Sequence, residues 1–350
     1  MPRNIGFVIG AFMQPQILAQ IENRRYPIHE YILFLRRNHA RAFYYDDLKR
    51  LDPERFEVLK AEGSLAWGMP RVVSSVDPPL DTVLATGEDV GLPLALDESA
   101  QKHRLPLYVI THGFVVRYAD AMEAVRCMDH VRFLCLSEQL KTMLVNKFGV
   151  PESRVTNTGY GVDTRFFRPA KDSSFSKPLI VSAGAANRDY RTFVNAVETL
   201  AVDVKIAADS AWCPTVIDID IDRLPPHIEV HSQGDYSGLR ELYAKASFIV
   251  VPLLPAPFAC GYAVIAEAMA MGKAVIATQT ESHSDFVIDG ETGYYVRPGD
   301  VQDLREKIEY LLAHPAWARE MGQRAQLRIE QNFSVEKYCE RLEREILDTG

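Results

Sequence analysis

The sequence is poor in cysteine, and its cysteines are not arranged in pairs. It has five in 350 residues, and no two of them form a Cys-x-x-Cys motif. This usage argues against a disulfide framework and against a zinc site, and it favours reduced thiols in a cytoplasmic protein. The five are scattered along the chain: Cys127, Cys135, Cys213, Cys260 and Cys339.

Long apolar runs, internal repeats and low-complexity tracts are also missing. No window approaches the length that crosses a bilayer. The apolar run within residues 1–9 is too short for the core of a signal peptide, and no cleavage signal follows it, so we expect none. With 47% apolar and 25% charged residues, the composition is that of a globular protein of about two domains.

The chain lacks an excess of positive charge. Its net charge is −8, which lies entirely in residues 166–350, because residues 1–165 are neutral. An acidic half argues against a nucleic-acid partner, whose phosphates require a basic surface. The neutral half holds an arginine cluster, which is typical of a solvated helix face. Binding of anionic lipid or of a phosphorylated acceptor is the alternative, so we expect at most peripheral membrane contact. Its members are Arg24, Arg25, Arg36, Arg37 and Arg41.

Short apolar runs alternate with helical stretches along the whole chain. A repeated strand-then-helix order predicts right-handed crossovers and parallel sheets. Two such series predict an α/β protein with two Rossmann-like, doubly wound domains. The expected strands are 5–9, 72–73, 82–85, 107–111, 132–136, 155–157, 179–183, 204–207, 228–231, 248–252, 274–278 and 293–296.

A polar segment at residues 169–178 separates the two series. We predict an N-terminal domain over 1–170, a C-terminal domain over 171–335 and a C-terminal helix over 336–350, for which a return toward the N-terminal domain is one arrangement. Asp300 is an expected N-cap of a late helix. Ligands bind beyond the carboxyl ends of strands in such domains, so two domains that face each other would enclose a cleft there.

Residues 259–278 carry the clearest chemical pattern. Gly261 opens an expected helix, whose first N–H groups and dipole attract an anion, and a residue without Cβ lets a diphosphate approach the backbone. Glu267 lies six residues further along, where a carboxylate can accept hydrogen bonds from two ribose hydroxyls. Its helical neighbours are apolar, and buried carboxylates are rare unless paired or functional. An ordinary helix packed on a sheet is the alternative, and the residues alone leave both open.

This segment resembles the donor-binding signature of family-four retaining glycosyltransferases of the GT-B fold. Three more segments resemble that family in the same order: 137–169, 182–190 and 289–294. The resemblance implies two Rossmann-like domains facing across a cleft. It also implies transfer of a hexose-type sugar from a nucleoside-diphosphate sugar without metal or other cofactor, and UDP-sugars are the family's most frequent donors. The acceptor would be a small molecule, a saccharide or a lipid-linked molecule.

The resemblance also assigns roles to residues of this chain. Glu267 falls at the position of the ribose ligand, and Arg188 falls at that of a lysine on the diphosphate. His112 falls at that of the N-domain histidine that faces the donor sugar and the acceptor, so His112 and Arg188 are the expected catalytic residues. The other residues expected at the donor are Gly10, Gly184, Cys260, Gly261, Tyr262 and Ala263.

The chain departs from the family in three places. Ala259 replaces a glutamate that contacts the transferred sugar, Ala183 replaces an arginine on the diphosphate, and residues 11–16 lack the usual glycine pair. The family implies a same-face mechanism, in which the leaving phosphate takes the acceptor's proton. A nucleotide-sugar epimerase or hydrolase, or a non-catalytic nucleotide-sugar-binding protein, is the alternative on the same scaffold.

Three weaker patterns remain. The Asp-Ile-Asp-Ile-Asp segment at 218–222 resembles the metal-binding motif of another glycosyltransferase fold. Charge alternation on an exposed segment explains it better, so we predict no metal site. Glu88 and Asp89 follow an expected strand at the edge where an acceptor would bind. His29 begins an expected helix and either lines the cleft or belongs to the cap.

Overall fold

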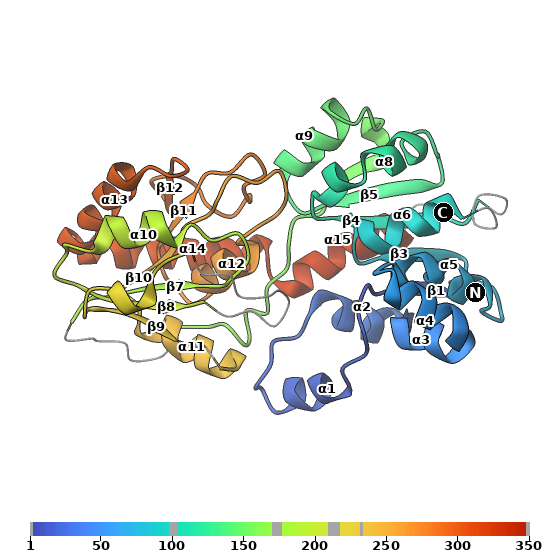
Figure 1. Cartoon of the computed structure of the whole chain (residues 1–350), viewed down its shortest axis with the longest axis horizontal. Coiled ribbons are helices and arrows are strands. Elements are labelled where there is room, and N and C mark those ends of the chain that lie inside the picture. The colour runs from blue at the N-terminus through green and yellow to red at the C-terminus, as the bar shows by residue number, and fades with distance from the viewer. Residues whose placement is uncertain (1–2, 98–103, 170–176, 209–217, 232–233, 348–350) are drawn as a thin grey trace. The chain divides into compact units, whose positions relative to one another are not determined.

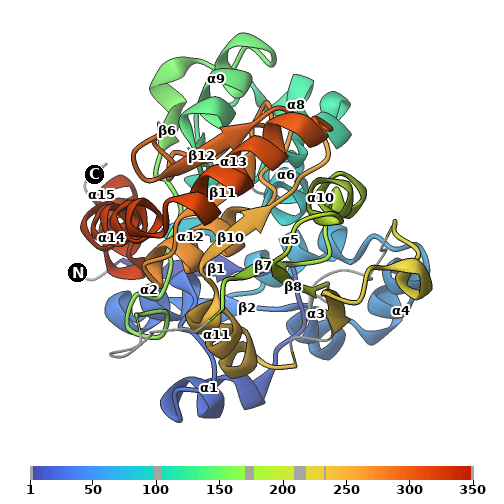
Figure 2. The ribbon, with the colours of Figure 1, turned by 90° about the vertical axis from the view of Figure 1, so that its left-hand side faces the viewer.

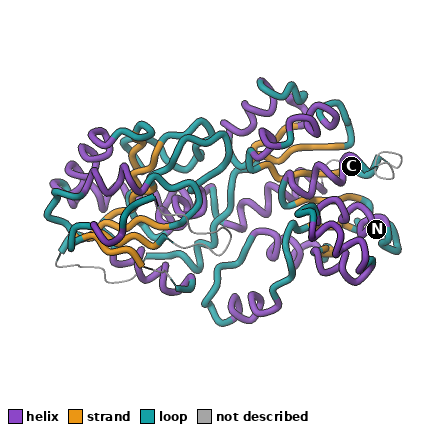
Figure 3. The backbone as a smooth tube through the Cα atoms, in the orientation of Figure 1, coloured by secondary structure: helices purple, strands orange, loops and turns teal. Residues whose placement is uncertain are grey.

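Two six-stranded parallel sheets organise the chain in the computed structural model (Figure 1). The strand orders are β2-β1-β3-β4-β5-β6 and β12-β11-β10-β7-β8-β9, so each sheet is wound in both directions from its first strand. Helices alternate with the strands in both halves (Figure 3). The predicted α/β fold with two doubly wound Rossmann-like domains is therefore confirmed. The structure describes residues 3–97, 104–169, 177–208, 218–231 and 234–347.

Continuous apolar runs form the strands, because a parallel sheet covered on both faces buries every side chain. All four residues of β1, β3, β10 and β11 are buried. The first sheet contains β1 (Ile5–Val8), β2 (Arg41–Phe43), β3 (Thr82–Ala85), β4 (Leu107–Thr111), β5 (Val131–Cys135) and β6 (Val155–Asn157). The second contains β7 (Leu179–Ala183), β8 (Asp203–Ala207), β9 (Ile228–His231), β10 (Phe248–Val251), β11 (Val275–Thr278) and β12 (Gly293–Val296).

Every predicted strand is present within one residue at each end, except the one at 72–73. That prediction is wrong, because these residues lie in the short helix α5 (Met69–Ser74), which has a proline in its first turn. A run of two apolar residues has no periodicity with which to distinguish a strand from a helix. The edge strand β2 was not predicted, since its first residue is an exposed arginine.

The helices expected to begin at His29, Gly261 and Asp300 have these residues as their N-caps. The main helices are α1 (Pro15–Glu22), α2 (Glu30–Asn38), α3 (Tyr45–Leu51), α4 (Pro53–Ala61), α6 (Glu88–Leu96), α8 (Ala119–Val125), α9 (Glu138–Asn146), α10 (Tyr190–Val197), α11 (Tyr236–Lys245), α12 (Tyr262–Ala270), α13 (Val301–Ala313), α14 (Pro315–Asn332) and α15 (Val335–Leu347). In the second half, α10 and α13 pack together over one face of the sheet (Figure 2), where Phe193 and Ile308 are fully buried.

By its contacts the chain forms two compact units. The first contains Met1–Gln16, His29–Gly159 and Tyr338–Gly350, and the second contains Ile17–Ile28 and Tyr160–Lys337. Residues 17–28 therefore belong with the second unit. There the N–H of Ile28 donates to Oδ2 of Asp163 at 2.8 Å, and the ring of Tyr26 meets that of Tyr236 with centroids 4.7 Å apart.

Some expectations fall partly outside the described residues. The predicted division near residue 170 lies at the start of the undescribed segment 170–176, and Cys213 lies in another. The four described cysteines are free thiols. The arginine cluster is not one helix face, because Arg36 and Arg37 end α2 whereas Arg41 lies on β2. Arg37 pairs with Glu343 of α15 at 2.9 Å.

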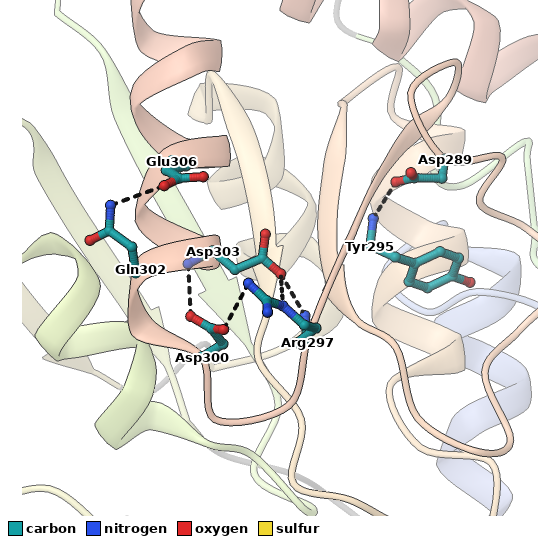
Figure 4. Close-up of polar contacts among 7 residues, drawn as sticks. All are labelled: Asp289, Tyr295, Arg297, Asp300, Gln302, Asp303 and Glu306. Carbon is teal, nitrogen blue, oxygen red and sulfur yellow. Dashed lines mark hydrogen bonds and ion pairs between the residues drawn. The ribbon is translucent and has the colours of Figure 1, made fainter.

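The start of α13 shows how the predicted cap works (Figure 4). Oδ1 of Asp300 accepts the backbone N–H of Asp303 at 2.9 Å, which satisfies one of the free donors of the first turn. The guanidinium of Arg297 pairs with Oδ2 of Asp300 at 2.9 Å and with the carboxylate of Asp303 at 3.2 Å. The Asp300 side chain therefore joins the helix to the strand that precedes it.

Replacing Asp300 by alanine is expected to lower the free energy of unfolding by about 1 kcal/mol, the usual effect of losing an N-cap. Urea denaturation at equilibrium measures this change. Gln302→Ala in the same turn is the matched control, because its side chain bonds only to Glu306, 3.1 Å away on the surface, and its effect should stay within about 0.5 kcal/mol. Equal effects in the two variants would contradict the capping role.

Candidate functional site

A glycine in the left-handed conformation starts α12. Gly261 has φ 76° and ψ −6°, a conformation that other residues adopt with strain, and a Cβ there would lie 3.1 Å from Cγ1 of Val251. No side chain caps the helix. Ala263 in its first turn is exposed, whereas Tyr262 is buried and donates from its hydroxyl to the carbonyl of Ser282 at 2.6 Å. The first N–H groups of α12 therefore remain available for an anion.

A tight turn after β7 holds Arg188. Gly184 has φ 93°, and a Cβ there would lie 2.4 Å from Nη2 of Arg188, so the guanidinium packs directly on the glycine backbone. Its Nε donates to the carbonyl of Ala183 at 2.9 Å, and Nη1 donates to that of Ala186 at 2.6 Å. The side chain is mostly buried, and two of its donors are used within the turn.

Asn187 connects this turn to the loop before α12. Its Nδ2 donates to the carbonyl of Leu254 at 2.8 Å and lies 3.5 Å from Sγ of Cys260. The backbone of Arg188 also forms a bridge with that of Leu253. Gly184, Arg188, Cys260 and Gly261 are thus brought to one place, at the carboxyl ends of β7 and β10.

Glu267 lies on the buried face of α12 and has a specific partner. Its side chain is 6% exposed, and Oε2 accepts a hydrogen bond from the hydroxyl of Tyr243 at 3.2 Å. Burial raises the pKa of Glu267 to about 8, although the Tyr243 hydrogen bond and the charge of Arg188 act in the opposite direction. Tyr243 is itself fully buried on α11. The carboxyl group of Glu267 is therefore held within the apolar helix face by the Tyr243 hydroxyl, and the charge of Arg188 lies near enough to lower its pKa.

In the first unit, candidate residues gather at the carboxyl ends of β1, β3 and β4. Nε2 of His112 lies 3.0 Å from the carbonyl oxygen of Thr86, and the N–H of Gly10 donates to Oγ1 of Thr86 at 3.2 Å. The carboxylate of Asp89 fills the space beside Gly10, where a Cβ would lie 2.6 Å from Oδ2. Gly10 thus borders a carboxylate, which repels a phosphate and accepts hydrogen bonds from hydroxyls.

The weaker candidates take different places. Glu88 is buried, whereas the adjacent Asp89 is exposed. His29 is the N-cap residue of α2, makes no side-chain cap bond and stacks on Tyr31 with ring centroids 5.8 Å apart. In the segment 218–222, the first two aspartates pair with arginines at 2.8 and 3.2 Å, and the described residues hold no cluster suited to a metal ion.

Sequence reasoning missed Tyr243 and Asn187. Tyr243 lies within an ordinary amphipathic helix, and nothing local indicates its partner. Asn187 has φ 55°, and asparagine is among the few residues that enter this region readily, so an Asn before Arg188 was a usable signal for the turn. Among the described helices, none combines the length and the apolar character needed to cross a bilayer.

These features define a protein of the GT-B fold, and comparison with known proteins agrees. Residues 177–314 match the family model described as Glycosyl transferases group 1. Sucrose-phosphate synthase from Thermosynechococcus elongatus superimposes with a TM-score of 0.70 at 17% identity, over 99% of this chain and 100% of that one. Anabaena HepE, solved with UDP and glucose, superimposes with a TM-score of 0.70 at 15% identity, over 99% and 100%. The predicted resemblance to GT-B glycosyltransferases, with the GT-B fold, is confirmed.

Curated relatives match over shorter lengths. An uncharacterized glycosyltransferase of Methanocaldococcus jannaschii, MJ1178, is 24% identical over 206 residues, which are 59% of this chain and 56% of that protein. Other curated proteins match over 77 residues, or 18% to 20% of their length. The chain thus spans about half or less of the curated relatives it matches.

Proposed function

We propose that the protein is a retaining glycosyltransferase that moves a hexose-type sugar from a nucleoside-diphosphate sugar to an acceptor, without a metal ion. The observation that carries the proposal is the group at the carboxyl ends of β7 and β10. There, the uncapped start of α12 at Gly261 lies beside the Arg188 turn, which Asn187 fastens to it. An anion site next to the buried carboxyl group of Glu267 suits a diphosphate joined to a ribose. HepE, a structural neighbour, has been solved with UDP and with UDP-glucose.

The proposed chemistry follows from where charge develops. As the bond from the sugar to the diphosphate breaks, negative charge grows on the leaving phosphate. Fixed donors aimed at that charge lower the barrier without having to reorganise. The first N–H groups of α12 and the guanidinium of Arg188 are such donors. The leaving phosphate would take the proton of the attacking hydroxyl, so that the sugar is added on the face from which the nucleotide departs.

On the acceptor side, we assign the sugar and acceptor contacts to His112 and Asp89 of the first unit. A carboxylate accepts hydrogen bonds from sugar hydroxyls, and an imidazole nitrogen can accept or donate one. The acceptor in this assignment is a hydroxylated molecule, and the group presented to Asp89 carries no phosphate.

Two measurements test the proposal. Thermal shift with a panel of nucleoside diphosphates should raise the melting temperature for at least one base, because a ligand that binds only the folded state stabilises it. Consumption of the matching nucleotide-sugar should then be slow alone and fast with a hydroxylated acceptor. Full-rate consumption without acceptor indicates an epimerase or hydrolase, and the absence of any nucleotide binding indicates a protein of another kind.

Turnover is expected to persist in excess EDTA, because protein donors supply the positive field that a metal would otherwise provide. The measurement is the rate of nucleoside-diphosphate release before and after chelation. Loss of turnover that magnesium or manganese restores would contradict this expectation, and it would direct attention to Asp218, Asp220 and Asp222.

A further inference from the structure

Glu88 is a buried glutamate at the first position of α6, in the first unit. Its side chain is 1% exposed, and its Oε1 accepts the backbone N–H of Gly113 at 2.8 Å. Its Oε2 is also buried and has no hydrogen-bond partner among the described residues. A buried carboxyl group with one open oxygen costs free energy, so its place beside the candidate histidine calls for an explanation.

The carboxyl group of Glu88 faces the turn that carries His112. Burial raises the pKa of Glu88, and the positive charge of His112 lowers it, as do the backbone N–H groups of residues 88, 112 and 113. Gly113 has φ 92°, so the chain bends sharply just after the histidine. The first residue of α6 thus binds the backbone directly after His112.

The imidazole ring is fixed separately. Nε2 of His112 lies 3.0 Å from the carbonyl oxygen of Thr86, and because a carbonyl oxygen can only accept, Nε2 must carry the hydrogen. Among the described residues Nδ1 has no hydrogen-bond partner, so Nδ1 is the ring nitrogen left open to a ligand. Residues 86–88 therefore hold His112 at two points, the ring through Thr86 and the backbone through Glu88.

Other titratable groups surround this pair without sharing its contacts. Asp89 follows on the same helix and is exposed. Partial burial raises the pKa of Tyr118, and the charges of Asp89 and Glu88 raise it further. Cys135 on β5 senses the charge of Glu88, and Arg117 lies over the ring of Phe114, which stacks on His112. None of these side chains receives the N–H of Gly113.

We propose that Glu88 is a positioning residue for His112. It holds the turn at residues 112–113 so that the ring donates from Nε2 to Thr86 and leaves Nδ1 to the substrate. The catalytic use of Nδ1 rests on the proposed function, whereas the positioning does not.

The experiment compares three variants in the full chain. Glu88→Leu removes the acceptor for the Gly113 N–H, and Glu88→Gln keeps an oxygen that can accept it. Leu140→Ala opens a cavity in the fully buried side of α9, on another helix of the same unit, and is the matched control for lost stability. The first readout is the pair of imidazole ¹⁵N chemical shifts of His112. These signals are assigned as the ones that are missing from the spectrum of His112→Gln.

The wild type and Glu88→Gln should both show His112 with hydrogen on Nε2. Glu88→Leu should show the averaged shifts of an unrestrained ring, and Leu140→Ala should match the wild type. Turnover should fall by about 10²-fold in Glu88→Leu, because a displaced catalytic group loses that much, with the KM for the donor little changed. Glu88→Gln should recover most of it.

An unchanged His112 spectrum in Glu88→Leu would overturn the proposal, as would an equal change in Leu140→Ala. If no nucleotide-sugar is consumed by the wild type, the proposed function fails while the spectra still decide the positioning. If the spectra change as expected but turnover does not, the positioning of His112 by Glu88 stands and the catalytic use of Nδ1 is overturned.

Discussion

Replacing His112 by alanine is expected to lower turnover by about 10²–10⁴-fold, the loss seen when a positioned catalytic group is removed. The affinity for the free nucleoside diphosphate should remain nearly unchanged. His112 belongs to the first unit, whereas Arg188 and Glu267, assigned to the diphosphate and the ribose, lie in the second, after β7 and on α12. The free diphosphate has no sugar through which it could lose a contact.

The measurement is paired: the steady-state rate of transfer, and calorimetric binding of the diphosphate product. His130→Ala is a suitable control, because His130 directly precedes β5 while His112 directly follows β4, so the two lie at opposite ends of a pair of neighbouring parallel strands. Wild-type turnover in His112→Ala would show that His112 is an ordinary loop residue with no part in the reaction. A large loss of diphosphate affinity would instead assign it to the phosphates.

Glu267→Gln is expected to weaken nucleoside-diphosphate binding by about 10-fold, the effect of losing one good hydrogen bond to the ribose. It should not weaken the fold equally, because a glutamine can still accept from the Tyr243 hydroxyl. The pH dependence separates the two effects. The pKa of Glu267 is about 8 in the folded chain against an ordinary 4.5, so the folded state keeps its proton over a range in which the unfolded state has lost it.

The free energy of unfolding of the wild type should therefore fall as the pH rises between these two pKa values. The stabilising contribution of protonated Glu267 is complete below pH 4.5 and is lost as pH rises to about 8, with a total of a few kcal/mol. Glutamine stays neutral, so the free energy of unfolding of the variant should rise relative to that of the wild type as the pH increases from 4.5 to about 8. Urea denaturation across that range measures it. Parallel pH curves, or unchanged nucleotide affinity, would contradict the assigned role.

Local patterns predicted most of the fold because buried parallel strands are continuous apolar runs. They failed at 72–73, where two residues carry no period. For the candidate site, the sequence predicted which residues take part but not which side chains they contact. The partner of Glu267 is Tyr243, 24 residues away, and only the packed helices bring them together. Glu88 and Asp89 are adjacent and chemically alike, so nothing in the sequence indicates that one is buried against the His112 turn and the other is exposed beside Gly10.

The assignment of residues 17–28 to the second unit has a consequence for domain exchange. The chain passes between the units four times, before residues 17, 29, 160 and 338, so no single cut separates one unit from the other. A fragment of 160–337 would leave the carboxylate of Asp163 without the Ile28 N–H and the ring of Tyr236 without Tyr26. Chimaeras that exchange the second unit with that of another protein therefore need to exchange this twelve-residue segment together with it.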